Sequence, residues 1–389
     1  QAEDGIRDAQ ESRGLGDVYK RQEQKLLIAT AGGDPPDVAG LVDPRVPQYA
    51  DQSALLPLDE LVQEHGIDVS LLKPIWLELC HYDGRLYALP STPFTIALYY
   101  NRALFREAGL DPNRPPATLD ELNAFAIRLT KKDASGRIRQ LGFTVSNAML
   151  GWWPWVWPCF FDARLWDGKR YNLDSPAGRA AAEWIRSLRD ALGRQAVLDF
   201  EAAAGAIESA QNPFLSGELA MVFQGPWMSN WIRRYTPDLD YAVAAFPSVT
   251  AERANVFASL DVLVIPRGAR HPQEAAVFLA WLARQENLEA LCRLHGKVSP
   301  FRAPSPAFFE GHPNPFVRVF DDLAMSPGTF GFPRMPTWAQ VESESIVLLQ
   351  SLLRGDRMPA AALAASQARI DAIVRDYERM AAQRRAAQR

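Results

Sequence analysis

The sequence has little of what several common protein classes require. Its three cysteines, Cys80, Cys159 and Cys292, lie far apart and form no C-x-x-C pair, so the usual zinc and redox motifs are missing. We expect small buried residues, with one disulfide left open. No apolar run is long enough to span a bilayer, and prolines interrupt the most aromatic stretch. The 42 basic and 46 acidic residues nearly cancel, so no positive field attracts nucleic acid.

Motifs of the common enzyme classes are also missing. The sequence has no G-x-S-x-G elbow, no H-E-x-x-H helix, no phosphate loop and no complete dinucleotide fingerprint. The five histidines are scattered and receive no catalytic role. We expect neither a cofactor nor a metal. A glycoside hydrolase stays open as the alternative, because it needs only two carboxylates at a defined separation.

The first 22 residues differ from the rest. They are polar, show no periodicity, and lack the apolar segment that a signal peptide needs. The peptides "QAEDGIRD" and "SRGLGDVYKRQ" match commercial sequencing adapters translated in frame, with a three-residue barcode between them. We therefore interpret residues 1–22 as non-native. A natural disordered leader is the alternative.

The remaining chain alternates between helical and extended patterns. With 48% hydrophobic residues it is long enough for two domains with their own cores. An apolar strand is predicted at Val38–Val42, and "TIALYYN" predicts another, followed by a short helix that stops at Gly109. Thr118 and Glu121 have the spacing of a capping box at a helix start. This alternation predicts an α/β fold.

The most unusual stretch is "GWWPWVWPCFF" at 151–161, with four tryptophans within six residues. Its prolines restrict the backbone, so the four rings cannot all face one core. An indole can lie against the C–H face of a sugar ring, and we choose Trp153 and Trp155 as candidates. Trp227 follows a predicted strand that ends at "GPW", where open α/β sheets bind ligands. For each ring, filling a core is the open alternative.

Six segments occur in a familiar order: "GGDPPDVAGLV", "DGRLYALP", "LYYNRALFREAGL", "GELAMVFQGPWMSNW", "VLVIPRGARHPQEAAVFLAWLA" and "LLRGDRMPAAALAASQARIDAIV". In this order the chain resembles the carbohydrate-binding, family 1 extracellular solute-binding proteins of ATP-binding-cassette (ABC) importers, which include maltose-binding-protein-like members. The resemblance runs from about Lys25 to about Tyr377. No single segment is diagnostic, but the ordered set is specific.

The resemblance implies a two-lobed periplasmic-binding-protein-like fold of type II, with lobes joined by crossing strands at "YALPSTPF" and "VFASLDV". It assigns 23–94 and 257–300 to the first lobe, and 95–256 and 301–389 to the second. The strand, helix and strand that precede "PPDV" in the family have no counterpart here. The second lobe would end in helices with Leu363, Ile370 and Ile373 on the apolar side and a frayed tail at 381–389.

The resemblance also implies which side chains contact the ligand. The tryptophan of "GPW" stacks on the sugar in the family, and polar contacts follow the "PPDV" strand. Most relatives have two glycines before the "VLVIP" strand, where this chain has Ser259, Leu260 and Asp261; Asp261 is therefore a candidate for a more specific contact. "GKVSPFRAP" and "RMPTWAQ" add cleft candidates, Arg334 among them. The predicted ligand-binding residues are Asp43, Arg45, Phe94, Trp153, Trp155, Trp227, Ser259, Asp261, Arg302 and Trp338.

The function implied by the resemblance is capture of a sugar or oligosaccharide between the lobes. A hinge rotation at the crossing strands would close the lobes over the ligand. The closed form would dock on the permease subunits of an ABC importer. We expect a monomer without enzymatic activity, in the periplasm or attached to the cell surface.

Overall fold

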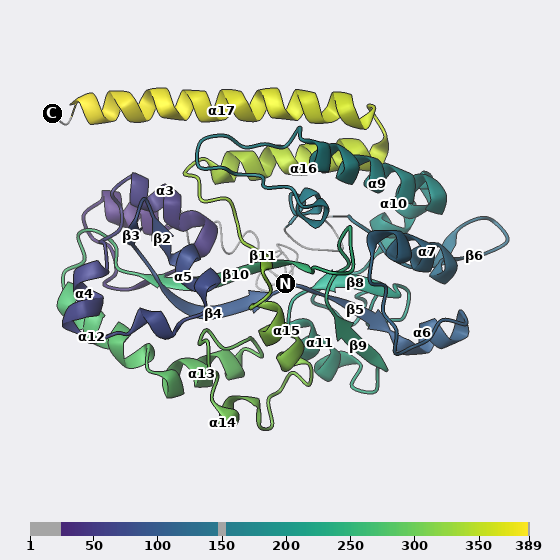
Figure 1. Ribbon diagram of the computed structural model, residues 1–389, viewed down its shortest axis with the longest axis horizontal. Coiled ribbons are helices and arrows are strands. Elements are labelled where there is room, and N and C mark those ends of the chain that lie inside the picture. Colours follow the sequence, from purple (N-terminus) through teal and green to yellow (C-terminus); the bar gives the residue numbers. More distant parts are fainter. Residues whose placement is uncertain (1–24, 147–152, 388–389) are drawn as a thin grey trace, which may run out of the picture.

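The protein folds into two α/β lobes, each organised around its own sheet (Figure 1). The computed structural model describes residues 25–146 and 153–387. The α/β architecture with two lobes that the sequence predicts is therefore confirmed. The predicted non-native segment 1–22 and Trp152 lie outside the described residues.

One long strand, β10 (Asn255–Val264), organises the sheet of the first lobe. β1 (Ala39–Val42) and β4 (Leu89–Thr95) pair with it in antiparallel orientation, and β11 (Gly328–Phe330) pairs with its beginning in parallel. β10 therefore joins three segments that are distant in the sequence. The predicted strand at Val38–Val42 agrees with β1 to within one residue.

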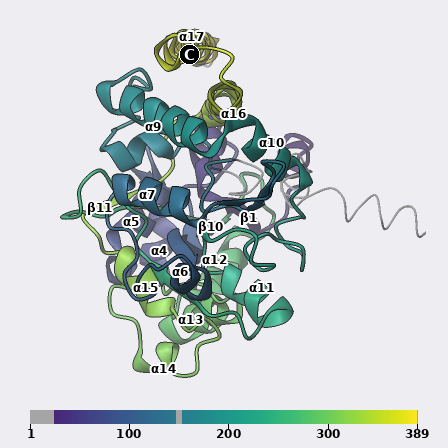
Figure 2. The same cartoon turned by 90° about the vertical axis from the view of Figure 1, so that its right-hand side faces the viewer.

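Short helices and turns surround this sheet (Figures 1 and 2). Three of the helices, α5, α12 and α14, begin with proline, which suits the first helical position because its missing N–H has no intrahelical partner there. The elements of this lobe besides its main strands are η1 (Asp43–Arg45), α3 (Val46–Asp51), α4 (Asp59–Glu64), η2 (Val69–Leu71), α5 (Pro74–Cys80), β2 (His81–Tyr82), β3 (Arg85–Leu86), α12 (Pro272–Leu282), α13 (Gln285–Leu294) and α14 (Pro306–Phe309).

The second lobe has a three-stranded antiparallel sheet. β5 (Ala97–Asn101) is its central strand and pairs with β8 (Met221–Gln224) and β9 (Tyr241–Ala244). The Thr118 side chain accepts a hydrogen bond from the Glu121 amide at the start of α7, which confirms the predicted cap. The other elements of this lobe are α6 (Arg102–Glu107), α7 (Leu119–Leu129), β6 (Lys131–Lys132), β7 (Ile138–Gln140), η3 (Trp157–Phe161), α9 (Pro176–Leu192), α10 (Arg194–Ala203) and α11 (Met228–Tyr235).

The chain passes from the first sheet to the second within a few residues. Only Ile96 separates β4 from β5, and its amide donates to the Phe257 carbonyl of β10 at 2.9 Å. Pro90 and Pro93 lie in β4, and both are buried. Because proline fixes φ, this crossing has a restricted backbone.

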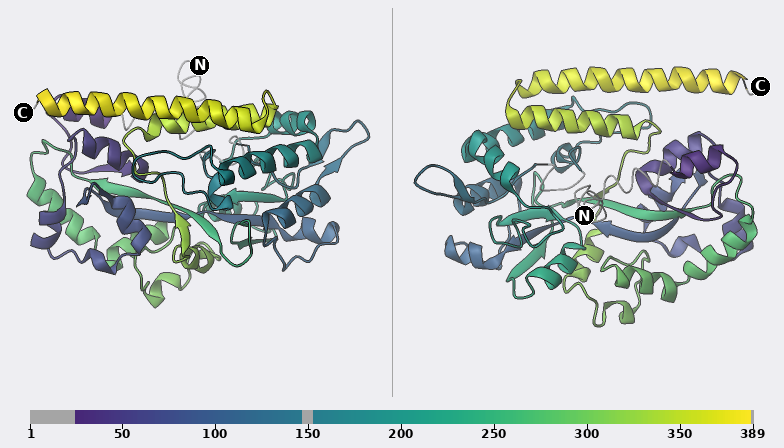
Figure 3. Two further views of the ribbon diagram at one scale, coloured as in Figure 1. Left: turned by 45° about the horizontal axis from the view of Figure 1, so that its top comes forward. Right: turned by 180° about the vertical axis from the view of Figure 1, so that it is seen from behind.

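Three helices and one strand complete the molecule. α15 (Val317–Leu323) lies beside β4, and β11 follows it. α16 (Trp338–Arg354) and α17 (Pro359–Ala387) form an antiparallel pair along one side of the molecule (Figures 1 and 3). α17 starts against α9 of the second lobe and ends over α3 of the first. The predicted frayed tail from residue 381 is wrong, because α17 continues to Ala387 and Arg384 contacts Asp51 at 3.3 Å.

One apolar core runs continuously through both lobes, and a small second cluster lies around Leu72, Leu288 and Phe301. The three cysteines are free and buried, as expected, and burial raises the pKa of each thiol. Among the described residues, no helix combines the length and apolar character needed to cross a bilayer.

Candidate functional site

The two crossing strands β4 and β10 carry several of the predicted residues on one shared face. Successive side chains of a strand point to opposite faces, so Phe257, Ser259 and Asp261 of β10 lie on the same face. The antiparallel register sets Phe94 opposite Ser259 and Thr92 opposite Asp261. Five side chains from two crossing strands therefore share this face.

A charged pair occupies one end of this face. Asp261 Oδ2 accepts hydrogen bonds from Thr92 Oγ1 at 2.5 Å and from Lys297 Nζ at 2.6 Å. The Lys297 ammonium also lies 5.2 Å from the ring centre of Phe94 and 5.9 Å from that of Trp227. Asp261, one of the predicted residues, is therefore an ion-pair partner whose side chain stays about one third exposed.

An aromatic cluster joins the two lobes next to this pair. Trp227 lies directly after the end of β8, as predicted, and packs edge-on against Phe94 with ring centres 4.9 Å apart. Trp153 lies 5.9 Å from Trp227 and 6.3 Å from Phe94. Phe94 comes from a first-lobe strand, whereas both tryptophans belong to the second lobe. Trp227 is partly exposed, and Trp153 is buried.

Asp43 lies against β10 and is completely buried. Its Oδ1 accepts from Ser259 Oγ at 2.5 Å and from the Leu260 amide at 3.2 Å. Burial raises the pKa of Asp43 to about 7, against the opposing effects of Arg334 and Ser259. The sequence predicts direct ligand contacts for Asp43 and Ser259. The structure instead bonds them to each other, so both are occupied within the protein.

Arg334 links the segment after β11 to the first lobe. Its Nη1 donates to the Asp43 carbonyl at 2.9 Å, and its Nη2 donates to the His81 carbonyl at 2.7 Å. Trp338, at the start of α16, is 1% exposed and packs against Trp155 with ring centres 5.1 Å apart. The predicted ligand contact of Trp338 is therefore not supported, because neighbouring rings cover its indole.

A cavity of about 500 Å³ opens beside these residues. α5 of the first lobe forms one side, and η3 with the loop that follows it forms the other. β11 and the start of β10 complete the wall. The lining residues are Ile75, Glu78, Leu79, Trp155, Cys159, Asp162, Ala163, Arg164, Leu165, Trp166, Arg253, Asn255, Gly328, Thr329, Phe330, Gly331, Phe332, Pro333 and Arg334.

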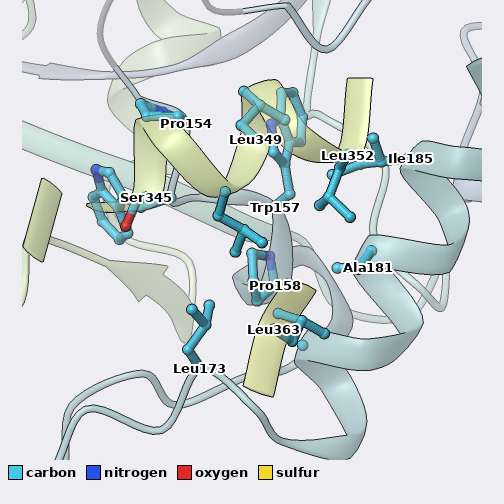
Figure 4. A pocket seen from close by; sticks show the side chains of 14 residues that line it. Pro154, Trp157, Pro158, Leu173, Ala181, Ile185, Ser345, Leu349, Leu352 and Leu363 are labelled. Carbon is cyan, nitrogen blue, oxygen red and sulfur yellow. The ribbon is translucent and has the colours of Figure 1, made fainter. Parts of the chain in front are cut away.

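A second, much smaller space of about 20 Å³ lies inside the second lobe. Figure 4 shows side chains around η3 and from α9, α16 and α17 pointing toward one another around it. It has room for about one water molecule, and its lining is almost entirely apolar. Trp157 belongs here, packed against Trp184 with ring centres 5.7 Å apart. This part of the tryptophan-rich stretch fills the core.

Of the ten predicted ligand-binding residues, only Trp155 lines the cavity, and Arg302 and Arg45 are two of those that do not. Arg302 is exposed and donates from Nε to the Leu72 carbonyl at 2.9 Å, next to the small cluster around Phe301. This position does not bring it to the crossing strands. Arg45 is half-buried at the end of η1 and is not among the residues that line the cavity.

Several residues at the site were not predicted from the sequence. Lys297 belongs to the segment "GKVSPFRAP", from which Arg302 was the candidate, and only the fold shows which cation faces Asp261. Trp166, Arg164 and Arg253 line the cavity from a loop and a strand start that carry no recognisable motif. In the described ranges, no group of three or more histidine, cysteine, aspartate or glutamate side chains is arranged to hold a metal ion.

Known proteins share this architecture. A putative binding protein of Brucella abortus (strain 2308) is 25% identical over 360 residues, which are 90% of this chain and 83% of that protein. The solved structure of CpMnBP1 with mannobiose bound has a TM-score of 0.77 and 27% identity, covering 88% of this chain and 86% of that one. UgpB from Mycobacterium tuberculosis, solved with glycerophosphocholine, has a TM-score of 0.76 and 24% identity, covering 92% and 89%.

The family assignment rests on a match that covers most of the chain. Residues 16–289 match the model of the bacterial extracellular solute-binding proteins. This range includes β1, both crossing strands and the "GPW" turn that precedes α11. The chain belongs to the family of bacterial extracellular solute-binding proteins.

Proposed function

We propose that this protein captures a sugar or oligosaccharide in the cavity between its lobes and delivers it to the permease of an ABC importer. The observation that carries the proposal is the cavity of about 500 Å³ with walls from both lobes. Its volume is in the range of small-molecule sites. A ligand in this position contacts both lobes at once.

The lining suits a carbohydrate in its chemistry. Trp166 and Phe330 line the cavity, are partly exposed, and offer flat apolar surfaces for the C–H face of a sugar ring. Glu78 and Asp162 offer carboxylate acceptors for hydroxyl groups. Mannobiose in the CpMnBP1 structure and maltotriose in the name of a Pyrococcus abyssi relative, 21% identical over 269 residues, support the same ligand class.

Ligand binding favours a closed arrangement of the lobes in this proposal. A ligand shifts a conformational equilibrium only if it binds one state more tightly, and contacts to both walls exist together only when the lobes are close. The hinge is proposed where the chain crosses, at residues 94/95 and 256/257, and in the segment that follows α14. The permease recognises the closed form, and the protein works as a monomer in the periplasm or attached to the cell surface.

The alternative, a glycoside hydrolase, has one observation in its favour. Glu78 and Asp162 both line the cavity, and such an enzyme needs two carboxylates. We propose binding without chemistry, because the family consists of solute-binding proteins. Release of reducing ends from an oligosaccharide by the purified protein would favour the hydrolase.

The test is a thermal-shift screen of oligosaccharides, followed by calorimetry with the strongest ligand. We expect Trp166→Ala and Phe330→Ala each to weaken binding by up to about tenfold, because each removes a cavity-lining aromatic surface worth about 0.5–1.5 kcal/mol. Trp281→Ala is the matched control, since this ring is 50% exposed on α12 and does not line the cavity. Absence of any carbohydrate ligand, or equal losses in all three variants, contradicts the proposal.

A further inference from the structure

The cavity wall carries three arginines. Arg164 lies in the loop after η3, Arg253 lies just before β10, and Arg334 lies after β11. Two acidic residues, Glu78 and Asp162, also line it. A charged side chain that already forms hydrogen bonds or ion pairs within the protein has fewer donors or acceptors left for a ligand. We therefore ask which of these five side chains already have such partners.

Two of the five charged side chains already form hydrogen bonds within the protein. Arg334 donates to the carbonyls of Asp43 and His81. Asp162 Oδ1 accepts from Asn255 Nδ2 at 2.8 Å. The two groups therefore stabilise the walls of the cavity.

Arg164 and Arg253 are different. Both are exposed at the cavity, and neither forms an ion pair or a side-chain hydrogen bond with any residue in the described part of the chain. Some exposed arginines elsewhere have acidic partners, such as Arg139 with Asp133 at 2.8 Å, whereas others, such as Arg357, have none in the described part of the chain. What sets Arg164 and Arg253 apart is their place in the cavity wall. The two cavity guanidinium groups thus keep their donors available.

Gly328 on β11 lets Arg253 lie close to the cavity wall. A Cβ atom at this position would come within 2.3 Å of the Ala254 carbonyl oxygen and 3.0 Å of Arg253 Nε. Any side chain here would displace the Arg253 segment. The absence of a side chain at Gly328 therefore leaves room for the Arg253 segment at the cavity wall.

A guanidinium group presents a planar set of donors that matches the two oxygens of a carboxylate or phosphate. We infer that the cavity takes a carbohydrate or polyol that carries an anionic group, either a uronic acid carboxylate or a phosphate ester, bound by Arg164 and Arg253. This inference rests on the proposed function and narrows its ligand class. Glu78, on the α5 side, is then left for hydroxyl groups at the uncharged end of the ligand.

The experiment compares matched pairs of ligands by calorimetry with the full chain. Digalacturonate is compared with galactobiose, and glycerol 3-phosphate with glycerol, each at low and high NaCl. We expect one acidic ligand to bind at least tenfold more tightly than its neutral counterpart, with an advantage that decreases as salt screens the charge. The two pairs distinguish a carboxylate from a phosphate ester.

Variants test whether these two arginines cause the preference. Arg164→Gln and Arg253→Gln should each reduce affinity for the acidic ligand about three- to tenfold and leave the neutral ligand unchanged. Arg357→Gln is the control, because this arginine is exposed in the loop between α16 and α17, outside the cavity. Galactobiose or another neutral sugar binding as well as the acids would overturn this inference alone. If no carbohydrate of either kind binds, the proposed function fails with it.

Discussion

At the scale of single residues, the most unusual group is the carboxyl of Asp43. It is completely buried, and burial raises its pKa from 3.8 to about 7 although Arg334, Ser259 and the Leu260 amide act in the opposite direction. The folded protein therefore holds this proton more tightly than the unfolded chain. Between these two pKa values, ionisation favours the unfolded state, so the contribution of Asp43 to stability decreases as pH rises.

We predict that Asp43→Asn becomes more stable relative to the parent protein as pH rises from about 4 to about 7. The asparagine keeps an oxygen acceptor for Ser259 and Leu260 but does not ionise. The difference in free energy of unfolding between variant and parent therefore increases by at most about 1.4 kcal/mol per pH unit. Urea unfolding at several pH values measures it. Asp356→Asn, at an exposed acid, is the control. A stability difference that does not depend on pH would contradict the assignment.

The site residues were predictable where the backbone decides their position. Trp227 follows a strand end, and Phe94 and Asp261 lie on crossing strands, so strand geometry alone brings them together. Sequence does not reveal whether a side chain near a strand end points into the cavity or into the core. For that reason Asp43, Ser259 and Trp338 were expected at the ligand and are buried instead.

At the scale of elements, a buried ion pair connects α5 to α15. Lys73 Nζ donates to Asp321 Oδ1 at 2.7 Å and to the Ser299 carbonyl at 2.8 Å. The two side chains are 1% and 9% exposed. α15 also lies against β4, so this pair helps to fix α15 to the first lobe.

Lys73→Ala should lower the free energy of unfolding by about 3–5 kcal/mol, because it leaves the Asp321 carboxylate buried without its partner. The double variant Lys73→Met, Asp321→Leu should recover much of this loss. Denaturant unfolding measures both, and Arg354→Ala, which removes an exposed ion pair with Asp356, should change stability by less than about 1 kcal/mol. A single variant as stable as the parent would disprove the role of the pair.

Local signals predicted the elements well, and long-range contacts account for what was missed. The capping residues of α7 and the glycine that ends α6 act within one turn of helix, so they can be read from the sequence. Lys73 and Asp321 are 248 positions apart, and nothing in either neighbourhood indicates the other. The continuation of α17 past residue 381 likewise depends on a contact with a distant helix.

At the scale of the whole molecule, α17 contacts both lobes. It runs along one side of the molecule (Figure 3) and packs on α9 of the second lobe. Near its other end, Tyr377 and Arg384 both contact Asp51 of α3. Tyr82 donates to the same carboxylate at 3.4 Å. A rotation between the lobes must either break these contacts or carry α17 with it.

We predict that the double variant Tyr377→Phe, Arg384→Gln loosens the ligand-free molecule. Loss of hydrogen bonds to a carboxylate, worth about 1–3 kcal/mol, shifts the balance toward more open arrangements. Small-angle scattering should show a larger radius of gyration than for the parent. Arg379→Gln is the control on the same helix, because this arginine pairs with Asp376 in the same helix. Identical scattering from all three proteins would show that α17 does not restrain the lobes.

β10 comes late in the chain, and its position determines the order in which the two sheets can form during synthesis. β1 and β4 are synthesised early, but the strand with which both pair comes only after the whole of residues 97–244, which contain the second sheet. During synthesis the second lobe can form its sheet from contiguous chain, whereas the first must hold its early strands unpaired. Their exposed edges are then open to association with other chains until β10 arrives.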